Sequence, residues 1–443
     1  MSGKVVITGM GWITPLGHDV QTVWDALLKG RSGMGPVTRF GARTFRTNFA
    51  SQVTGFDLKN FMPADEAERH ADASLSSKFA IAAARQAVRQ AGLDRGGSFN
   101  PRRFGIYLGA GEGAMDFANY SASHLAGWSE QTRKVEGRPF AEAALQRLTV
   151  ACETEQEPNL TVSHVAWDLG IRGPASNCMT ACAASTQAIG EALELIRRGD
   201  ADVMLAGGAH SMIHPLGMTG FIRLTAMSQR RDDPSTAARP FDATRDGFVM
   251  GEGAAMVVLE SEEHASARGA TALAEVAGYG STADAFRITD IAPEHRGAQE
   301  SIRASLRQAG IDPREPDEGG ARSRVHYFCA HGTGTKENDK LETAAVKAVF
   351  GPLAPTVPFS SVKSMLGHLI QAAGAAGTIV CVQSIRTGWV PPTINLHHPD
   401  PACDLDHVPN VARDLNPLGG VKVCLNNSAG FGGQNDTVCI RAV

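Results

Sequence analysis

One stretch of this sequence occurs twice, and that repeat limits the folds open to the chain more than any other feature. Arg85–Asp94 (RQAVRQAGLD) returns about 220 positions later as Arg303–Asp312 (RASLRQAGID). Each copy has the alanine-rich pattern of an amphipathic helix and is followed by a short apolar run, Phe104–Leu108 or Val325–Cys329. Since such a run is typical of a buried strand, the repeat predicts two copies of one α/β unit.

Strand and helix patterns alternate through the rest of the chain as well. Glycines cluster at the ends of short apolar runs, as in Lys4–Gly11 and Val203–Gly208, where a buried strand enters a tight turn. The alternation predicts an α/β layered fold. Two stretches of small residues, Ala181–Leu193 and Gly367–Ile379, predict helices buried at the centre between two half-sheets. The amphipathic helix patterns cover Leu75–Ala91, Ser185–Arg198, Gln299–Ala309 and Lys340–Val349.

Composition excludes several classes of protein. The 42 Lys and Arg against 46 Asp and Glu give a net charge of −4, which offers no basic field for nucleic acid. The longest apolar runs, Ala254–Leu259 and Ala372–Val382, are too short or too rich in glycine to span a bilayer. The first residues lack the layout of a signal peptide. We therefore expect a soluble cytoplasmic protein that binds neither nucleic acid nor membrane.

The eight cysteines are scattered singly and mostly inside apolar stretches. Only Cys178 and Cys182 lie close together, and no CxxC pair or local histidine completes a zinc site with them. We predict reduced, buried thiols and no metal.

Cys182 stands where a loop enters an alanine-rich helix pattern, within Asn177–Ser185 (NCMTACAAS). The helix dipole and the free N–H groups of a helix N-terminus stabilise a thiolate, so this position suits a nucleophile. The same local sequence also suits a small buried cysteine, and it does not decide between the two.

Two histidines and a glycine-rich turn complete the set of candidate residues. His331 follows a buried strand pattern in the loop His331–Thr335 (HGTGT), where open α/β sheets bind their ligands. His368 opens the second alanine-rich helix, with Lys363 shortly before it. The turn Asn426–Asn435 is rich enough in glycine for its backbone to approach a ligand and direct N–H groups at an oxyanion. Core histidines and a surface hairpin are the alternatives.

These four motifs, in this order, resemble the β-ketoacyl-acyl carrier protein synthases of the elongating Cys-His-His type. That type includes the KAS II-type fatty-acid enzymes and the ketosynthases of type II polyketide systems. The resemblance covers nearly the whole chain and implies the thiolase fold, a five-layered αβαβα arrangement of two similar halves that usually dimerises. Further matching stretches are Val5–Gly11, Ala238–Asp242, Arg245–Phe248 and Pro391–Leu396.

We expect the N-terminal half, which carries the nucleophile, to comprise residues 1–265. The C-terminal half, which carries both histidines, would comprise residues 266–443. The α/β pattern weakens over residues 112–158, where a polar stretch predicts a cap inserted into the first half.

The resemblance implies a decarboxylating Claisen condensation. Cys182 would accept the acyl group as a covalent nucleophile, with the oxyanion held by the backbone N–H groups of Cys182 and Phe431. The malonyl thioester would then lose carbon dioxide, and His331 and His368 would stabilise the enolate as neutral N–H donors. Attack of the enolate on acyl-Cys182 gives a β-ketoacyl chain two carbons longer.

Further residues take roles from the same resemblance. Lys363 and Glu342 resemble the family's ion pair, which would orient His368 and bias its protonation. Thr333 and Thr335 resemble the hydroxyls that hold a phosphopantetheine arm. No cofactor is implied beyond that arm, because both substrates arrive on it.

The glycine-rich turn carries both a match and a departure. Phe431, between Gly430 and Gly432, resembles the gate of the acyl pocket, and Phe248 resembles an aromatic wall beside the nucleophile. Ala429 stands where the family usually has the first Phe of a Phe-Gly-Phe-Gly-Gly turn. The gate is therefore expected to move differently from that of the fatty-acid enzymes.

Pathway and partners follow from the resemblance too. Lys336–Thr343 (KENDKLET) is closer to the type II polyketide ketosynthases, so we expect a polyketide or polyene-like pathway, with fatty-acid elongation as the alternative. A non-catalytic partner subunit is a third hypothesis, which the intact Cys182, His331 and His368 oppose.

The expected partners are an acyl carrier protein with malonyl- and acyl-thioester substrates, and a second subunit. That subunit is either another copy or a chain-length-factor-like protein. Because carriers in this family present an acidic face, we expect basic residues around the pocket mouth.

Overall fold

The fold is built on one large central sheet. The computed structural model describes residues 3–94, 99–111, 116–317 and 319–443. Ten strands pair in the order β12-β11-β15-β16-β10-β1-β9-β8-β4-β7. The strands from the first part of the chain are β1 (Val5–Ile13), β4 (Phe104–Gly109), β7 (Ala175–Cys178), β8 (Val203–His210) and β9 (Gly253–Ser261). Those from the second part are β10 (Ala274–Ala283), β11 (Tyr327–Cys329), β12 (Phe359–Ser360), β15 (Val423–Gly430) and β16 (Gln434–Arg441).

The two sets of five strands have the same topology. From the outer edge inwards, the order β7-β4-β8-β9-β1 of the first set corresponds to β12-β11-β15-β16-β10 of the second. The sets join at β1 and β10, where Val6 pairs with Glu275 and Ile7 with Ala274. The predicted duplication of one α/β unit is therefore confirmed, while the boundary at residue 265 stays a prediction.

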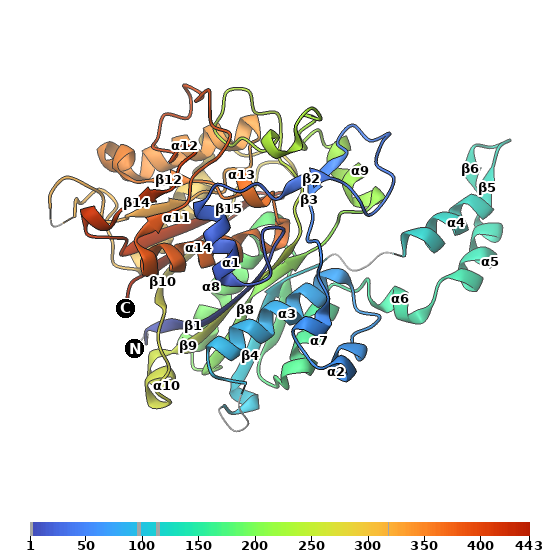
Figure 1. Ribbon diagram of the computed structural model, residues 1–443, viewed down its shortest axis with the longest axis horizontal. Coiled ribbons are helices and arrows are strands. Elements are labelled where there is room, and N and C mark those ends of the chain that lie inside the picture. Colours follow the sequence, from blue (N-terminus) through green and yellow to red (C-terminus); the bar gives the residue numbers. More distant parts are fainter. Residues whose placement is uncertain (1–2, 95–98, 112–115, 318) are drawn as a thin grey trace.

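Helices cover both outer faces of the sheet sets and fill the space between them (Figure 1). The first outer face carries α3 and α7, and the second carries α11 and α12, while α8 and α14 lie between the two sets. This is the expected five-layered α/β arrangement. The bounds are α3 (Leu75–Gln90), α7 (Leu160–Leu169), α8 (Ala184–Arg197), α11 (Arg296–Gln308), α12 (Lys336–Phe350) and α14 (Ala373–Thr387).

The two central helices approach closely because their facing residues are small. A Cβ at Gly374 of α14 would lie 2.0 Å from the Thr186 hydroxyl of α8, so any side chain there would overlap it. A Cβ at Gly377 would meet the Asn426 amide of β15 at 2.1 Å. The Ser185 hydroxyl accepts a hydrogen bond from the Ala375 N–H at 2.9 Å, which ties the two helices together. The stretches of small residues thus allow the layers to meet.

Shorter elements complete the body and surround the ends of the central helices. A 3-10 turn, Ala181–Ala183, leads into α8, and another, Ile370–Ala372, leads into α14. The other α-helices and strands of the body are α1 (Val20–Leu28), β2 (Met34–Pro36), β3 (Phe49–Ser51), α2 (Ala64–Glu68), α9 (Pro215–Arg223), α10 (Glu262–Ala267), α13 (Lys363–Leu366), β13 (Trp389–Val390) and β14 (Arg413–Asp414).

The polar insertion forms an arm that points away from the body rather than a cap that covers it (Figure 1). It lies between β4 and β7, inside the first set of strands, as expected; residues 112–115 at its start lie outside the described residues. Its helices α4 and α5 pack on each other. Apolar side chains such as Leu125 and Leu145 remain exposed along it. The arm comprises α4 (Phe117–Gly127), β5 (Trp128–Ser129), β6 (Lys134–Val135), α5 (Gly137–Arg147) and α6 (Val150–Thr154).

Across the described ranges, every helix is too short or too polar to cross a bilayer.

We predict that Gly374→Ala lowers the free energy of unfolding by about 1–3 kcal/mol, because the added methyl group overlaps Thr186 in a packed interior. Gly220→Ala is the matched control, since Gly220 lies in α9 with nothing within 4 Å of its Cβ position. That control is expected to be neutral or slightly stabilising. Urea unfolding followed by circular dichroism measures both, and equal stability of the two variants would contradict the tight central packing.

Candidate active site

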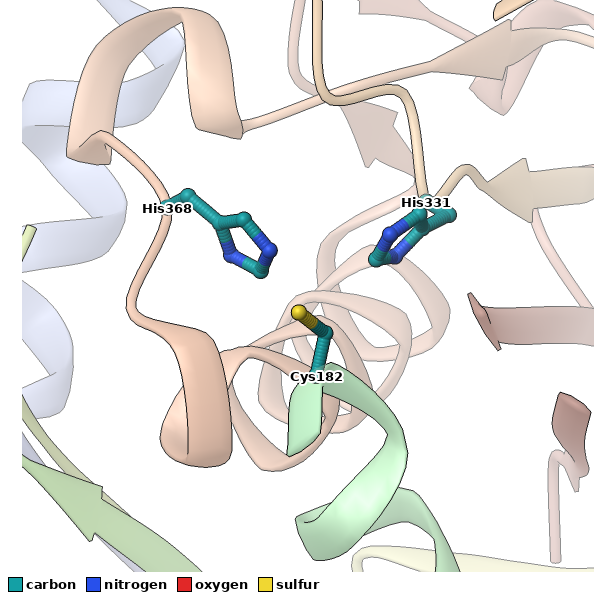
Figure 2. Close-up of side chains that lie close together, drawn as sticks. All are labelled: Cys182, His331 and His368. Carbon is teal, nitrogen blue, oxygen red and sulfur yellow. The ribbon is translucent and has the colours of Figure 1, made fainter. Parts of the chain in front are cut away.

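Three side chains from three distant parts of the chain meet at the ends of the central helices (Figure 2). Cys182 lies in the 3-10 turn before α8, His331 directly after β11, and His368 between α13 and α14. The Cys182 sulphur and one ring nitrogen from each histidine all lie within 4.8 Å of one another. The imidazole rings are nearly perpendicular, with centroids 5.5 Å apart. All three side chains are buried. The three residues singled out from separate motifs thus form one cluster.

The backbone that presents Cys182 is strained. Ala181 has φ 48°, a left-handed conformation that costs free energy for a residue with a Cβ. Ile370 has φ 43° at the corresponding position before α14, and the two 3-10 turns contact each other. The duplicated fold therefore places two equivalent strained turns side by side. One of them positions the thiol at the N-terminus of α8, where helix N–H groups favour its thiolate.

The second strained turn fixes the protonation pattern of His368. The Ile370 N–H donates a hydrogen bond to His368 Nδ1 at 3.2 Å. A neutral ring that accepts at Nδ1 must carry its proton on Nε2. His368 Nε2 is buried with no hydrogen-bond partner among the described residues. The ring therefore keeps an unused N–H donor in the cluster.

Both histidines are held neutral by their surroundings. Burial lowers the pKa of His331 well below 6.5, and the nearby Lys363 charge and then His368 lower this pKa further. Burial and then the Lys363 charge lower the pKa of His368 in the same way. Neutral imidazoles in a buried site can donate hydrogen bonds to a developing negative charge without transferring a proton to it.

Glu342 and Lys363 are buried beside the two histidines. The Glu342 carboxylate accepts hydrogen bonds from the N–H groups of His331 (2.7 Å) and Gly332 (2.8 Å) and from the Asn427 amide (2.8 Å). Its pKa is raised by burial, while these bonds and the Lys363 charge oppose the rise. Among the described residues, no ion pair within 4.0 Å joins Glu342 to Lys363. The two charges therefore interact through space, and Glu342 binds the backbone that carries His331.

A cavity of about 800 Å³ opens onto the cluster. The Thr333 and Thr335 hydroxyls lie 3.0 Å apart on its wall. Phe248 packs edge-on against His368, with centroids 5.3 Å apart. Phe431 is 38% exposed. The predicted site residues that line this cavity are Cys182, Phe248, His331, Thr333, Thr335, His368, Gly430, Phe431 and Gly432, whereas Glu342 and Lys363 lie outside its lining.

The glycine-rich turn lies directly against the nucleophile. A Cβ at Gly430 would be 2.7 Å from the Thr180 carbonyl oxygen and 3.4 Å from the Cys182 nitrogen. Only a residue without a side chain lets these two segments come so close. The turn that carries Phe431 therefore lies next to the Cys182 backbone at the cavity.

Two family models match the chain: the N-terminal domain of β-ketoacyl synthases over residues 2–265 and their C-terminal domain over residues 273–397. The chain is 40% identical over 438 residues to 3-oxoacyl-[acyl-carrier-protein] synthase 2 of Staphylococcus aureus (strain N315), a match that covers 99% of this chain and 98% of that protein. The chain belongs to the β-ketoacyl synthase family.

Solved structures agree with this assignment. The ishigamide ketosynthase/chain length factor matches with a TM-score of 0.85 and 34% identity over 100% of both chains. A ketosynthase bound to a hexaketide, in complex with its type II polyketide synthase acyl-carrier protein, matches with a TM-score of 0.85 and 32% identity over 100% of both chains. The predicted family and thiolase fold are confirmed, and the β-ketoacyl synthase is an enzyme of the acyltransferase class.

Two contacts in this synthase could not be predicted from the sequence. The Ile370 N–H fixes the tautomer of His368 through the backbone, so no side-chain type signals it. Asn427 binds the Glu342 carboxylate and lies in the glycine-rich turn motif, where its role could not be told from that of its neighbour Asn426. Only the fold brings these groups to the histidines.

The donor atoms of the cluster would also suit zinc, which accepts thiolate and imidazole ligands. A metal held there would occupy the thiolate that an acyltransferase needs as its nucleophile. The absence of a metal from the working enzyme stays a prediction.

We predict that the condensation rate of this synthase is level from about pH 8 down through 6.5 and falls only at lower pH. Because the pKa values of both histidines are lowered, their neutral forms persist below the usual range, and protonation begins as the pH falls through the lowered pKa. Protonation of His368 at Nδ1 would also break its bond from the Ile370 N–H. Initial rates with saturating substrate test this, and a midpoint at or above 6.5 would contradict it.

Proposed function

We propose that this synthase condenses a malonyl thioester, with loss of carbon dioxide, onto an acyl chain held by Cys182. The clustering of the Cys182 sulphur with a nitrogen of His331 and of His368 within 4.8 Å, at the cavity, carries the proposal. These groups supply a nucleophile and two hydrogen-bond donors at one point.

In the first step the Cys182 thiolate attacks the carbonyl carbon of an acyl thioester. The carbonyl oxygen becomes an oxyanion, which the N–H groups of Cys182 and Phe431 stabilise. Collapse of this intermediate expels the carrier thiolate, which takes up a proton, and leaves acyl-Cys182. The close approach of Gly430 to the Cys182 nitrogen supports this arrangement of donors.

In the second step a malonyl thioester breaks its bond to the carboxylate and releases carbon dioxide. The electron pair of that bond becomes an enolate, whose oxygen accepts hydrogen bonds from His331 and His368. The fixed Nε2 proton of His368 supports this role. The enolate carbon then attacks acyl-Cys182, and the thiolate leaves as the new carbon–carbon bond forms.

The other residues act on substrates or on the histidines. Thr333 and Thr335 would bind the phosphopantetheine arm, which is the only prosthetic group that the reaction needs. Phe431 would gate the acyl pocket and Phe248 would form its wall beside the nucleophile. Burial keeps both histidines neutral, and the Lys363 charge lowers their pKa values further.

The partner that delivers both substrates is an acyl carrier protein. Two exposed arginines lie near the segment Leu224–Ala226, which lines the cavity. Arg223 comes directly before this segment at the end of α9, and Arg231 follows later in the chain, where its Nη2 donates to the Arg43 carbonyl oxygen. Cations at the mouth favour an acidic carrier. A relative in complex with its acyl-carrier protein supports the same partner.

The synthase acts as a dimer, either with a second copy or with a chain-length-factor-like subunit. Strand β7 is the last strand of its sheet, and Ala175 and Ser176 in it are exposed, so it offers an unpaired edge. A relative that is a ketosynthase/chain length factor supports the heterodimer. Sedimentation equilibrium of the chain alone separates the two, since a heterodimer-forming chain would not self-associate tightly.

The pathway is of the type II polyketide or polyene-like kind. Two structural relatives at 34% and 32% identity with full coverage support it. Fatty-acid elongation is the second candidate, favoured by the 40% identity to 3-oxoacyl-[acyl-carrier-protein] synthase 2. A panel of acyl donors decides between them, because a polyketide enzyme extends β-ketoacyl chains, a polyene enzyme extends unsaturated chains and a fatty-acid enzyme extends saturated ones.

We predict that the two half-reactions separate by mutation. Cys182→Ala loses acyl loading, because no thiol remains to form the thioester. His331→Ala and His368→Ala keep loading but lose about 10²-fold or more in condensation, since the enolate loses a donor. Intact mass of the protein measures loading from an acyl carrier, and the product formed after addition of malonyl carrier measures condensation. Loading that survives in Cys182→Ala would contradict the assigned nucleophile.

We predict that Arg223→Glu and Arg231→Glu each raise KM for the acyl carrier severalfold and leave kcat unchanged, because these charges act on encounter and not on chemistry. Arg89→Glu is the control, since Arg89 is 66% exposed on α3, in the outer helix layer. Steady-state kinetics with the carrier at low ionic strength measures the change. Equal KM in all three variants would place the carrier elsewhere.

A further inference from the structure

Arg245 is a buried arginine that joins two chain segments beside the active site. Its side chain is 3% exposed. The guanidinium donates from Nε to the Thr335 carbonyl oxygen (3.1 Å) and from Nη2 to the Lys336 carbonyl oxygen (2.9 Å). Its Nη1 donates to the Asp242 carbonyl oxygen (2.9 Å) and to the Asp400 carboxylate (2.6 Å). Four of its five N–H groups are therefore used, and two of them hold the turn that begins at His331.

The same turn is held from its other side by Asp339 of α12. One oxygen of the Asp339 carboxylate accepts the Gly334 N–H at 3.1 Å, and the other accepts the Phe241 N–H at 2.8 Å. Asp339 is fully buried and lies 3.5 Å from Arg245 Nε. The arginine and the aspartate form one ion pair, which binds two carbonyl groups at the end of the turn and one N–H group within it.

The segment that carries Arg245 also carries a neighbour of the second histidine. The Gly247 N–H donates to the Gly334 carbonyl oxygen at 3.1 Å, so the segment runs along the turn. The next residue, Phe248, packs edge-on against His368. A single guanidinium therefore connects the turn of His331 with the aromatic ring that contacts His368.

We infer that Arg245 is a positioning residue that sets the spacing between His331 and His368. Arg245 is not among the residues that line the cavity. This role rests on the proposed function, in which both imidazoles must donate to one enolate oxygen. Donors aimed at one atom tolerate little displacement, and a shift of about 1 Å can cost about 10²-fold in rate.

If Arg245 sets this spacing, its loss affects the two half-reactions differently. At saturating acyl carrier, the chemical step of acyl loading needs Cys182 and the backbone donors beside it, none of which bonds to Arg245. A shift of Thr333 and Thr335, which would bind the arm, changes KM in both half-reactions and not the rate at saturation. Condensation needs both histidines at their spacing. Loss of the Arg245 fork therefore slows condensation and spares loading, whereas a general loss of stability affects both.

The experiment uses Arg245→Lys in the full-length chain, which keeps the buried positive charge for Asp339 and Asp400 but removes the planar fork. At saturating carrier, condensation is expected to fall about 10- to 100-fold, and the rate of Cys182 acylation to stay within about twofold of the wild type. Arg85→Lys is the matched control. Arg85 is a mostly buried arginine bonded in the same fork geometry to Asp168, in the outer layer of the first half, and both rates should stay within about twofold in that variant.

A second variant keeps the inference testable if Arg245→Lys does not fold. Asp400→Asn acts at a side chain that is 24% exposed and removes only the charge that binds Arg245 Nη1. Condensation is expected to fall about threefold with loading unchanged, because a charged hydrogen bond becomes a neutral one.

Four results would decide the matter. A folded Arg245→Lys variant that condenses at the wild-type rate, or that loses both half-reactions equally, overturns the role of Arg245. If only Asp400→Asn folds, an unchanged condensation rate in it does the same. Wild-type protein that neither loads nor condenses contradicts the proposed function itself.

Discussion

The close contact between α8 and α14 is the constraint on which the rest of the structure depends. It requires Gly374 to lie against Thr186, and it brings together the two strained turns that open these helices. One turn holds Cys182 and the other, through the Ile370 N–H, fixes His368. A single packing interface between equivalent helices therefore creates a nucleophile and a proton donor side by side, and neither half of the chain could form the site alone.

The third member of the cluster is positioned by buried carboxylates instead of by packing. Glu342 and Asp339 both lie on α12 and together accept the N–H groups of His331, Gly332 and Gly334. Burying two carboxylates costs free energy unless each is paired and hydrogen-bonded. Arg245 and the Asn427 amide provide part of that compensation. The protein tolerates this cost in free energy because the two buried carboxylates hold the turn that begins at His331 in one rigid conformation.

Much of this organisation could be predicted from the sequence. The repeat beginning at Arg85 and Arg303 predicted the duplicated sheet, and Cys182, His331 and His368 were identified from their motifs. The contacts that orient them could not be found in this way. The Ile370 N–H is a backbone group, and Arg245 lies nearly 90 residues before the turn it holds, so their roles exist only after folding. The arm was expected as a cap, because a polar insertion reveals its place in the chain but not its direction.

The buried positive charge of Lys363 beside the two imidazoles has a role in the chemistry. Its charge lowers the pKa of His331 and of His368, in addition to the effect of burial. A carboxylate in that place would raise both pKa values and favour imidazolium, an acid strong enough to protonate an enolate. With Lys363 there, the rings stay neutral, and each can still donate one hydrogen bond to an enolate. The electrostatics of the site therefore select donation without proton transfer, which is what a decarboxylating condensation requires.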